Sequence, residues 1–324
     1  MSDNLLEVKN LYMNYETLEG KVAAVQDVSF SISKGQSFGL VGESGCGKTS
    51  VAMSLLKLQA DNGFIDSGSI FIDGTDIVPL EEKELRSIRW NKISIVFQGA
   101  MNAWNPVIKV GEQIREALRE HYPENTKHIN YNKMVSLFNM VGLDDSVLNR
   151  YPHELSGGMK QRAIIALALS CDPKLIIADE PTTALDVVIQ DQILNELKKI
   201  QENLGLGVLY ISHDISVIAE MTDNMAVMYA GRIIEKGPTK DLFANPKHSY
   251  TKLLLESTPS VVGEKKKLYS LDGKPPSLMD EIQGCSFSPR CPNPTNDCKN
   301  GLIEMGLIET ENGHWVDKCC VNCG

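Results

Sequence analysis

The chain has 324 residues, a formal net charge of −10 and 42% hydrophobic residues. This length and composition predict a soluble globular protein of about two domains. The acidic balance argues against a nucleic-acid-binding face, which would be basic. No apolar run approaches the ~18–20 residues of a membrane span, and the opening residues MSDNLLEVKN lack the basic-then-apolar layout of a signal peptide. We therefore expect any function at a membrane to require docking on another protein.

Residues 5–40 alternate apolar and polar side chains, as in LEVKNLYMNY and KVAAVQDVSFSIS. Alternation with a period of two predicts antiparallel strands with one buried face. The pairs Lys34-Gly35 and Asp73-Gly74 are turn signals. The N-terminal part is therefore predicted to form an antiparallel β subdomain.

The segment GESGCGKT, Gly42 to Thr49, fits the phosphate-binding loop pattern G-x-x-x-x-G-K-[S/T] at every fixed position. It follows an apolar strand-like run, SFGLV, and precedes a helical pattern, SVAMSLLKL. This setting favours a phosphate loop over a glycine-rich turn that fits by chance. Because such loops direct backbone N–H groups at a polyphosphate, we expect Lys48 to reach the β- and γ-phosphates and the Thr49 hydroxyl to bind Mg²⁺. The candidate nucleotide contacts here are Gly42, Ser44, Gly45, Cys46, Gly47, Lys48, Thr49 and Ser50.

From about residue 80 to residue 150 the apolar spacing becomes helical, in LEEKELRSIRW, VGEQIREALREHY and YNKMVSLFNMVGL. The motif LSGGMKQR, Leu155 to Arg162, follows. Its residues Ser156, Gly157 and Gly158 form a second anion-binding turn at the start of a helical pattern. One phosphate loop is enough to hold one nucleotide, so the second turn suggests that another nucleotide is held from the opposite side.

From residue 160 to residue 230, helical patterns alternate with short apolar strands, KLIIAD, GVLYIS and NMAVMYAG. This alternation predicts a parallel sheet with crossover helices. The run LIIADE ends in Asp179 and Glu180, at the carboxyl edge of the sheet, where open α/β sheets bind ligands. Asp179 is placed to hold Mg²⁺ through water, and Glu180 to polarise an attacking water. Strands with acidic ends are common, and the order of this one after the phosphate loop favours the catalytic interpretation.

Together these motifs resemble the ATPase subunits of ABC transporters, whose signature motif is LSGGQ-like, with Met159 standing here at the Gln position. The resemblance covers residues 1 to about 260. It implies an α/β P-loop NTPase domain with the antiparallel β subdomain and a helical subdomain at about 99–168. It identifies the Q-loop Gln98, the D-loop Ala184-Leu185-Asp186, the switch His213 and the adenine-stacking Tyr15. For Tyr15 the alternative is packing, with Leu11-Tyr12 as a competitor.

The family mechanism implies a role for each matched residue, since phosphoryl transfer depends on positioning and charge neutralisation. The implied Mg²⁺ ligands are Thr49, Gln98 and Asp179, and the implied catalytic residues are Glu180, His213 and Gln98. Ser156 to Gly158 would face the γ-phosphate of ATP held by a partner chain. ATP would then join two subunits, and hydrolysis would release them.

The segment after Gln98 contains Met101, Asn102, Trp104 and Asn105. In the ABC family this is where the permease's coupling helix docks. Trp104 is predicted to be an exposed aromatic anchor for that contact. The alternative is that it packs inside the helical subdomain.

The segment ANPKHSYTKLLLES, Ala244 to Ser257, resembles the NPxHPYT segment of oligopeptide and dipeptide importers, with Ser249 in place of the usual Pro. The extension at 261–324 carries most of the cysteines, namely Cys285, Cys291, Cys298, Cys319, Cys320 and Cys323. In that importer branch such cysteines hold a [4Fe–4S] cluster. The resemblance implies Cys285, Cys291, Cys298 and Cys319 as its ligands, with Cys320 as the alternative fourth ligand.

Thiolates are soft ligands that suit either an Fe–S cluster or zinc, so Zn²⁺ is the alternative metal and free or oxidised thiols are a third possibility. Residues 285–324 hold few large apolar side chains, and a metal centre is a plausible organiser for a segment that buries so little apolar surface. These cysteines lie far along the chain from Lys48 and Glu180. The sequence therefore implies no redox role for them in hydrolysis.

The resemblance as a whole implies an ATP-hydrolysing, nucleotide-binding subunit that powers an ABC importer for dipeptides and oligopeptides. It implies a heterodimer with a related ATPase at the cytoplasmic face of the cell membrane, beneath two transmembrane permease subunits. An extracytoplasmic solute-binding protein would deliver the solute, and no nucleic acid is involved. The alternatives are import of oligosaccharides or nickel, a soluble ABC ATPase of DNA repair or translation, and a module that uses nucleotide only as a switch. The importer-like tail disfavours the soluble ATPase, and Glu180 with His213 disfavours the switch.

Overall fold

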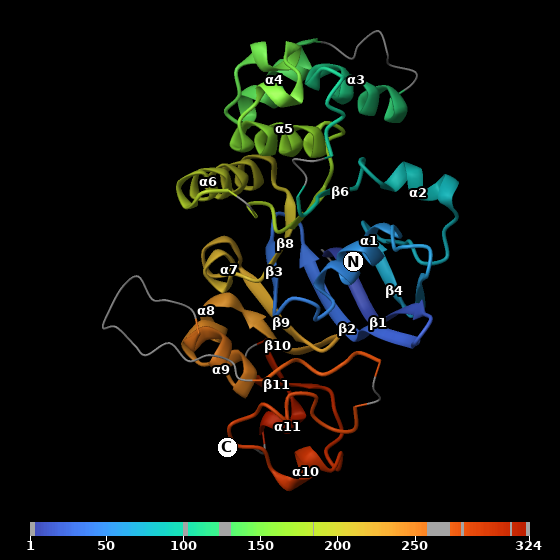
Figure 1. The fold of residues 1–324 in the computed structure, drawn as a ribbon, viewed down its shortest axis with the longest axis vertical. Helices are drawn as coiled ribbons and strands as arrows, with labels where there is room; N and C mark the ends of the chain where they lie inside the picture. Colours follow the sequence, from blue (N-terminus) through green and yellow to red (C-terminus); the bar gives the residue numbers. More distant parts are fainter. Residues whose placement is uncertain are drawn as a thin grey trace. The chain divides into compact units, whose positions relative to one another are not determined.

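A computed structural model of the chain describes residues 4–99, 103–122, 131–183, 185–257, 273–279, 282–311 and 313–321 (Figure 1). The chain forms two compact units. Unit 1 comprises Met1–Leu6, Ile32–Gln36 and Phe71–Leu209, and unit 2 comprises Glu7–Ser31, Ser37–Ile70 and Tyr210–Gly324. Among the described residues, none of the helices combines the length and the hydropathy that a membrane span requires.

Most of the antiparallel β subdomain belongs to unit 2. Its strands β1 (Asn4–Thr17), β2 (Gly20–Ser33) and β4 (Gly63–Ile72) lie in the order β2-β1-β4. In unit 1, the end of β4 forms an antiparallel hairpin with β5 (Thr75–Asp76). The predicted turns at Lys34-Gly35 and Asp73-Gly74 are present, and both glycines adopt positive φ, 72° and 78°.

Strand β3 (Ser37–Val41) of unit 2 is buried along its whole length. It runs parallel to β9 (Asn224–Tyr229), with Phe38 opposite Asn224. From β9 the sheet continues through β10 (Arg232–Pro238) and β12 (His314–Asp317) to β11 (Leu307–Glu311). The helices of this unit up to the tail are α1 (Lys48–Leu56), α7 (Ile215–Met221), α8 (Thr239–Ala244) and α9 (Ser249–Glu256).

The strands β11 and β12 were not predicted from the sequence. Residues 285–324 contain few large apolar side chains, and we expected them to bury too little apolar surface to order themselves. The structure shows that this end of the chain is ordered partly by backbone pairing. Glu235 and Lys236 of β10 lie opposite Val316 and Trp315 of β12. Two short helices, α10 (Asn296–Lys299) and α11 (Lys318–Val321), complete the described tail. The predicted boundary between 260 and 261 lies outside the described residues.

Unit 1 contains the parallel pair β6 (Ile93–Val96) and β7 (Leu175–Asp179), with Ile93 opposite Leu175. Its helical group consists of α3 (Val110–His121), α4 (Tyr131–Met140), the 3-10 turns η3 (Asp145–Asn149) and η4 (Pro152–Glu154), and α5 (Gly157–Leu169), drawn in green in Figure 1. Val110, Ile114 and Leu118 are buried at helical spacing along α3. The unit also contains α2 (Glu82–Ile88) and α6 (Val187–Leu204), and β8 (Gly207–Ser212) begins in unit 1 and ends in unit 2.

A buried carboxylate in unit 2 holds the segment that begins at Lys247, shortly after α8. Glu235 is fully buried, and its oxygens accept the N–H groups of Lys247 at 2.7 Å and His248 at 3.0 Å. The Nε2 atom of His314 lies 2.7 Å from the same carboxylate. One side chain of β10 thus ties together the NPKHSYT segment and β12. Buried charges of this kind are tolerated only when partners satisfy them.

We predict that Glu235→Gln lowers the free energy of unfolding by about 3 kcal/mol, because it leaves buried hydrogen-bond donors facing an amide N–H₂ group. Denaturant titration of the full chain, together with limited proteolysis between residues 245 and 321, measures the effect. The matched control is Glu311→Gln, since Glu311 is exposed and pairs with Lys247 at 3.4 Å. That surface pair contributes less than ~1 kcal/mol, so equal losses in both variants would contradict the anchoring role of Glu235.

Candidate functional site

The phosphate loop lies in unit 2 between β3 and α1. Two of its glycines allow close backbone contacts. A Cβ atom on Gly42 would lie 2.2 Å from the carbonyl oxygen of Met228, and one on Gly47 would lie 2.2 Å from that of Ala24. Gly47 also adopts φ 105°, a left-handed value that disfavours any side chain. The loop therefore has little freedom to accept another residue at either position.

Lys48 is nearly buried at the first position of α1. Its Nζ atom donates to the carbonyl oxygens of Gly42 at 2.7 Å and Glu43 at 3.0 Å. Burial raises the pKa of the neighbouring Cys46 thiol in spite of the Lys48 charge, which acts in the opposite direction. The thiol therefore stays protonated, and the ammonium group supplies a positive charge inside the loop.

Tyr15 lies beside the first turn of α1. Its hydroxyl is 3.2 Å from the Oγ atom of Ser50, and its side chain is half-buried. The competing aromatic, Tyr12, is exposed. The structure thus puts Tyr15 next to a residue that directly follows the phosphate loop, and its stacking on adenine stays a prediction.

In unit 1 the predicted catalytic residues Gln98 and Glu180 meet although they are 82 residues apart. The Nε2 atom of Gln98 donates to Oε2 of Glu180 at 2.7 Å, and the Thr183 hydroxyl donates to the same oxygen at 2.9 Å. Glu180 has φ 48°, a value that turns the chain sharply at the end of β7. Asp179, the last residue of β7, is buried.

The predicted signature turn also lies in unit 1. Ser156 is the N-cap of α5, and its Oγ atom accepts the N–H of Met159 at 3.3 Å. Ser156 and Gly157 are exposed, whereas Gly158 approaches α6 so closely that a Cβ atom would lie 2.8 Å from Ile189. The turn is therefore accessible and rigidly supported.

The remaining matched residues follow the ends of strands. Asp186 caps α6 by accepting the N–H of Ile189 at 3.0 Å, and Ala184 lies outside the described residues. His213 is exposed and directly follows β8, in unit 2. The predicted nucleotide-binding and catalytic residues thus divide between the units. Tyr15, the phosphate loop and His213 lie in unit 2, and Gln98, Asp179, Glu180 and the signature turn lie in unit 1.

The prediction that Trp104 is an exposed anchor is wrong. Trp104 is only 5% exposed, and its Nε1 atom donates to the carbonyl oxygen of Lys160 at 3.4 Å. It packs within unit 1 because its large apolar ring finds a buried place beside α5, and the indole N–H finds a backbone acceptor there. Met101 and Asn102 lie outside the described residues, while Asn105 is exposed.

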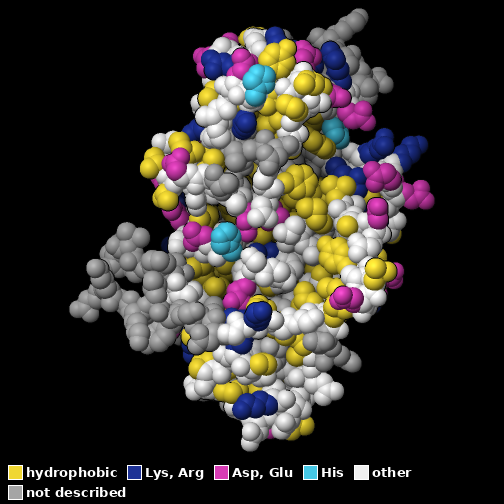
Figure 2. All heavy atoms as spheres, viewed as in Figure 1, with side chains coloured by type: hydrophobic (Ala, Val, Ile, Leu, Met, Phe, Trp, Pro, Cys, Tyr) yellow, Lys and Arg dark blue, Asp and Glu magenta, His cyan; other side chains and the backbone are white. Residues whose placement is uncertain are grey.

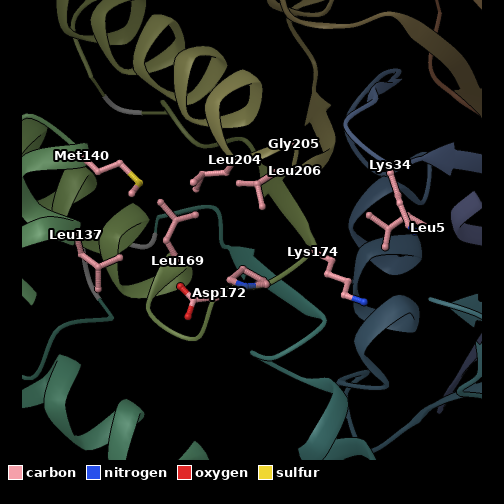
Figure 3. A pocket seen from close by; sticks show the side chains of 11 residues that line it. Leu5, Lys34, Leu137, Met140, Leu169, Asp172, Lys174, Leu204, Gly205 and Leu206 are labelled. Atoms are coloured by element: carbon pink, nitrogen blue, oxygen red, sulfur yellow. The ribbon is translucent and has the colours of Figure 1, made fainter. Parts of the chain in front are cut away.

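Unit 1 also contains an apolar pocket of about 450 Å³, shown in Figure 3. Leu137 and Met140 of α4, Leu169 of α5 and Leu204 of α6 contribute to its wall. The pocket includes none of the predicted site residues. We therefore assign no nucleotide to it.

On the face drawn in Figure 2, the described Lys and Arg side chains are scattered among Asp and Glu side chains rather than gathered in one area. Charge of both signs distributed in this way provides no continuous track for a phosphate backbone on that face. Anion binding is therefore better sought at the phosphate loop and the signature turn.

The cysteine-rich end of unit 2 gathers potential metal ligands around a histidine that the sequence analysis did not select. The side-chain donor atoms of His248, Cys319 and Cys320 lie within 4.8 Å of one another. The Sγ atoms of Cys319 and Cys320 are 3.8 Å apart. His248 caps α9, and its Nδ1 atom accepts the N–H of Tyr250 at 3.0 Å. The sequence of the NPKHSYT segment indicates only the transporter family when it is considered alone. A histidine in a chain with a cysteine-rich end is also a candidate metal ligand.

Charge interactions within this group favour thiolates. Hydrogen bonding with Cys319 lowers the pKa of the Cys285 thiol and that of the Cys320 thiol. The same bonds raise the pKa of Cys319 itself. Burial lowers the pKa of His248 and the neighbouring Cys285 and Cys320 raise it, while its Nδ1 atom carries no proton because it accepts the N–H of Tyr250.

Two of the predicted cluster ligands, Cys291 and Cys298, are not among the described residues whose donor atoms lie within 4.8 Å of one another. Cys298 is buried and accepts the hydroxyl of Thr295 at 3.0 Å, and Cys291 is half-buried. Cys323 lies outside the described residues. The structure thus brings Cys319 and Cys320 together with His248, and Cys285 is hydrogen-bonded to Cys319 and His248.

Comparison with known proteins gives the class of this chain. Residues 25–183 match the family model described as ABC transporter, and residues 234–298 match the C-terminal region of oligopeptide and dipeptide transporters. The chain resembles a solved ATP-binding cassette dimer in a post-hydrolysis state bound to ADP and Pi, with a TM-score of 0.62 and 28% identity over 72% of this chain and 98% of that one. It also resembles cbiO1 of Clostridium perfringens, part of an ABC transporter complex, with a TM-score of 0.64 and 28% identity over 75% and 92% of the two chains. The chain therefore has the ABC ATPase cassette fold and is an ABC-type ATPase.

The curated relatives narrow the family. The chain is 44% identical to a dipeptide transport ATP-binding protein of Bacillus subtilis, over 90% of this chain and 88% of the relative. It is 42% identical to an oligopeptide transport ATP-binding protein of Haemophilus influenzae, over 91% of each. The chain belongs to the family of ATP-binding subunits of dipeptide and oligopeptide transporters.

We predict that Lys48→Ala weakens ADP binding by about ten- to a hundredfold, because charge-assisted hydrogen bonds to phosphate oxygens are lost. Isothermal titration calorimetry on the purified chain measures the affinity. Lys21→Ala removes a more exposed lysine of the same unit, paired with Asp66 at 3.6 Å, and should bind ADP normally. Unchanged affinity in the Lys48 variant would contradict the phosphate-binding role of the loop.

Proposed function

We propose that this chain is the ATP-hydrolysing subunit of an importer for dipeptides or oligopeptides. The observation that carries the proposal is the match of residues 234–298 to the C-terminal region of oligopeptide and dipeptide transporters, next to an ABC ATPase core. The relatives named for dipeptide and oligopeptide transport cover nearly the whole chain. They favour a peptide over an oligosaccharide or nickel as the transported solute.

In this proposal the phosphate loop binds the polyphosphate, with Lys48 at the β- and γ-phosphates and Tyr15 against the adenine. The hydroxyl of Thr49, the amide of Gln98 and the carboxylate of Asp179 would hold Mg²⁺, since they are the oxygen donors that Mg²⁺ prefers. A bound Mg²⁺ would supply positive charge to the phosphates. Gln98 donates its N–H₂ to Glu180 at 2.7 Å, and an amide oriented in this way directs its oxygen elsewhere, so it remains suited to a cation.

Glu180 is the residue that acts on the attacking water. Gln98 and Thr183 both donate to one of its carboxylate oxygens, and two such bonds restrict the rotation of the side chain. A fixed carboxylate orients the water and accepts its proton. His213 contacts the γ-phosphate, and Gln98, bonded directly to Glu180, transmits the nucleotide state to the segment that follows it.

The signature turn supplies the second half of a nucleotide site to a partner chain. Ser156 and Gly157 are exposed at the N-terminus of α5, where backbone N–H groups and the helix dipole attract an anion. We infer a heterodimer with a related ATPase, docked at the cytoplasmic face of the membrane on two permease subunits. A solute-binding protein on the other side delivers the peptide.

The cysteine-rich end fits a metal centre. Soft thiolate donors suit iron–sulfur or zinc chemistry, and Cys285, Cys298 and Cys319 are buried. The Nε2 atom of His248 is buried without an oxygen or nitrogen partner among the described residues, as expected of a group directed at a metal or its ligands. We propose a [4Fe–4S] cluster on Cys285, Cys291, Cys298 and Cys319, with Zn²⁺ on His248, Cys285, Cys319 and Cys320 as the alternative. Such a centre would stabilise the tail, which contributes few apolar side chains.

We predict that Glu180→Gln lowers ATP hydrolysis about 10²–10⁴-fold, the range for loss of a general base, and leaves ATP binding intact. The measurement is phosphate release by the transporter assembled with its permeases. Glu202→Gln changes an exposed acid on α6 and should hydrolyse ATP at the normal rate. Near-normal turnover in the Glu180 variant would overturn this assignment.

The same variant tests the shared site, because blocked hydrolysis should trap the ATP-bound dimer. Light scattering with and without ATP should show association of Glu180→Gln. Adding Ser156→Arg should abolish that association while ADP affinity of the single chain persists. A double variant that still associates with ATP would argue against a signature turn acting across an interface.

The two metal assignments differ in their ligands, and this difference predicts opposite results. If the cluster is present, anaerobically purified protein contains iron and sulfide, absorbs visible light, and loses both on Cys298→Ser but not on His248→Asn. If zinc is present, His248→Asn releases it and Cys298→Ser does not. Cys171→Ser, at a buried cysteine of unit 1, is the control. Metal-free protein with a protease-resistant tail would refute both assignments.

A further inference from the structure

Glu43, the second residue of the phosphate loop, is held on three sides within unit 2. Its carboxylate accepts both terminal nitrogens of Arg290, at 2.7 and 2.9 Å. Its backbone N–H donates to the hydroxyl of Tyr250 at 3.0 Å, and its carbonyl oxygen accepts from Lys48 at 3.0 Å. Side chain and backbone of this one residue are thus fixed together.

Two of the three partners come from the end of the chain. Tyr250 lies in α9, directly after the core, and Arg290 lies between Cys285 and Cys291 in the run CSFSPRC. Arg290 is separated from Glu43 by 247 residues. Both partners fall in the part that matches the C-terminal region of oligopeptide and dipeptide transporters. The contact therefore joins the cysteine-rich end directly to the nucleotide-binding core.

A buried aromatic cluster supports the contact. The Phe287 ring lies edge-on to Tyr229 at 5.3 Å and to Tyr250 at 5.4 Å, and the two tyrosine rings are 4.7 Å apart. The guanidinium of Arg290 lies 5.8 Å from the Tyr229 ring centre and donates to its hydroxyl at 3.3 Å. Because these rings are almost fully buried, the segment that carries Arg290 has a defined position against the loop.

The ion pair between Glu43 and Arg290 is stronger than an ordinary surface ion pair. The Arg290 side chain is 5% exposed and that of Glu43 23% exposed. Bidentate pairs of arginine and carboxylate combine charge with fixed geometry. Partial burial reduces screening by water and salt. Removing one partner would leave the other charge poorly solvated at the edge of the loop.

The charge of Glu43 also bears on the ligand. A carboxylate in a loop that receives a polyphosphate repels it, and the repulsion grows as solvent is excluded. The Arg290 guanidinium offsets that charge. A single residue of the tail can therefore act on the loop in two ways, by fixing its backbone and by cancelling a repulsive charge.

We propose that Arg290 is a positioning residue for the nucleotide, which holds the phosphate loop through Glu43 and makes the affinity for ATP depend on an ordered cysteine-rich end. This rests on the proposed phosphate site at Lys48. It gives the tail a role in nucleotide binding, where the sequence alone implied none. Disturbing the tail near Cys285 and Cys291 should then weaken nucleotide binding without any change in the loop sequence.

The test compares Arg290→Met, Arg290→Lys and the double variant Arg290→Met/Glu43→Gln in the full chain purified without oxygen. Arg290→Met should weaken ADP binding about ten- to a hundredfold by calorimetry, the range for a lost charge-assisted hydrogen bond. Arg290→Lys keeps the charge but loses the second parallel bond, and should lie between it and wild type. The double variant should recover part of the affinity, because the repulsive carboxylate is gone.

A second readout separates positioning from general loss of structure. Hydrogen exchange at residues 42–49 should speed up in Arg290→Met by more than the overall loss of stability explains, while the metal content stays close to wild type. In the assembled transporter KM for ATP should rise more than kcat falls. Lys240→Met removes an exposed cation on α8 and should change none of these quantities.

The outcomes distinguish this inference from the proposed site. If Lys48→Ala weakens ADP binding but Arg290→Met and Arg290→Lys bind normally, the positioning role is wrong and the phosphate site stands. If Lys48→Ala also binds normally, the phosphate site itself is wrong. If Arg290→Met binds ADP weakly but also unfolds at a lower denaturant concentration than wild type, Arg290→Lys decides between the two explanations. Normal ADP affinity together with a normal unfolding midpoint in Arg290→Lys would then refute the positioning role.

Discussion

The conformation of the phosphate loop is the constraint on which the rest of unit 2 depends. The loop approaches β9 so closely that Gly42 has no room for a side chain against Met228. Its inward carbonyl oxygens bind the ammonium of Lys48, which lies almost buried beneath them. Such a conformation depends on support from neighbouring elements. β9, α9 and the segment that carries Arg290 all contact it, so the tail belongs to the framework of the loop.

Local patterns predicted the elements that carry the chemistry. The loop GESGCGKT joins a buried strand to a helix, Ser156 caps α5, and LIIAD forms a buried strand that ends at Asp179. Each of these depends on residues within one short stretch, where glycine, capping side chains and apolar runs have direct physical consequences. The order of the motifs also put Gln98 and Glu180 into one site, and the structure brings them to 2.7 Å.

What the sequence did not predict depends on contacts between distant segments. Trp104 comes shortly after the exposed Gln98. Nothing in the neighbouring sequence indicates that its indole N–H donates to the carbonyl oxygen of Lys160. The strands β11 and β12 are short and partly polar, and they form because β10 offers its edge and Glu235 binds His314. His248 was not predicted as a metal ligand because it lies more than 70 residues before Cys319 and Cys320 in the sequence. In each case the decisive partner lies 56 to 79 residues away or on another strand.

The pair Glu43–Arg290 has a consequence that acts in both directions. Coupling free energies are reciprocal. If an ordered tail raises the affinity of the loop for nucleotide by some factor, bound nucleotide raises the equilibrium constant for ordering the tail by the same factor. Nucleotide would therefore order the segment around Cys285 and Cys291, and a metal centre there would in turn favour the nucleotide-binding loop. The cysteines are too distant in sequence to suggest this, and Phe287, Tyr250 and Arg290 supply the physical path. The described part of the tail holds none of the predicted catalytic residues, and it can still act on nucleotide affinity through the position of one loop.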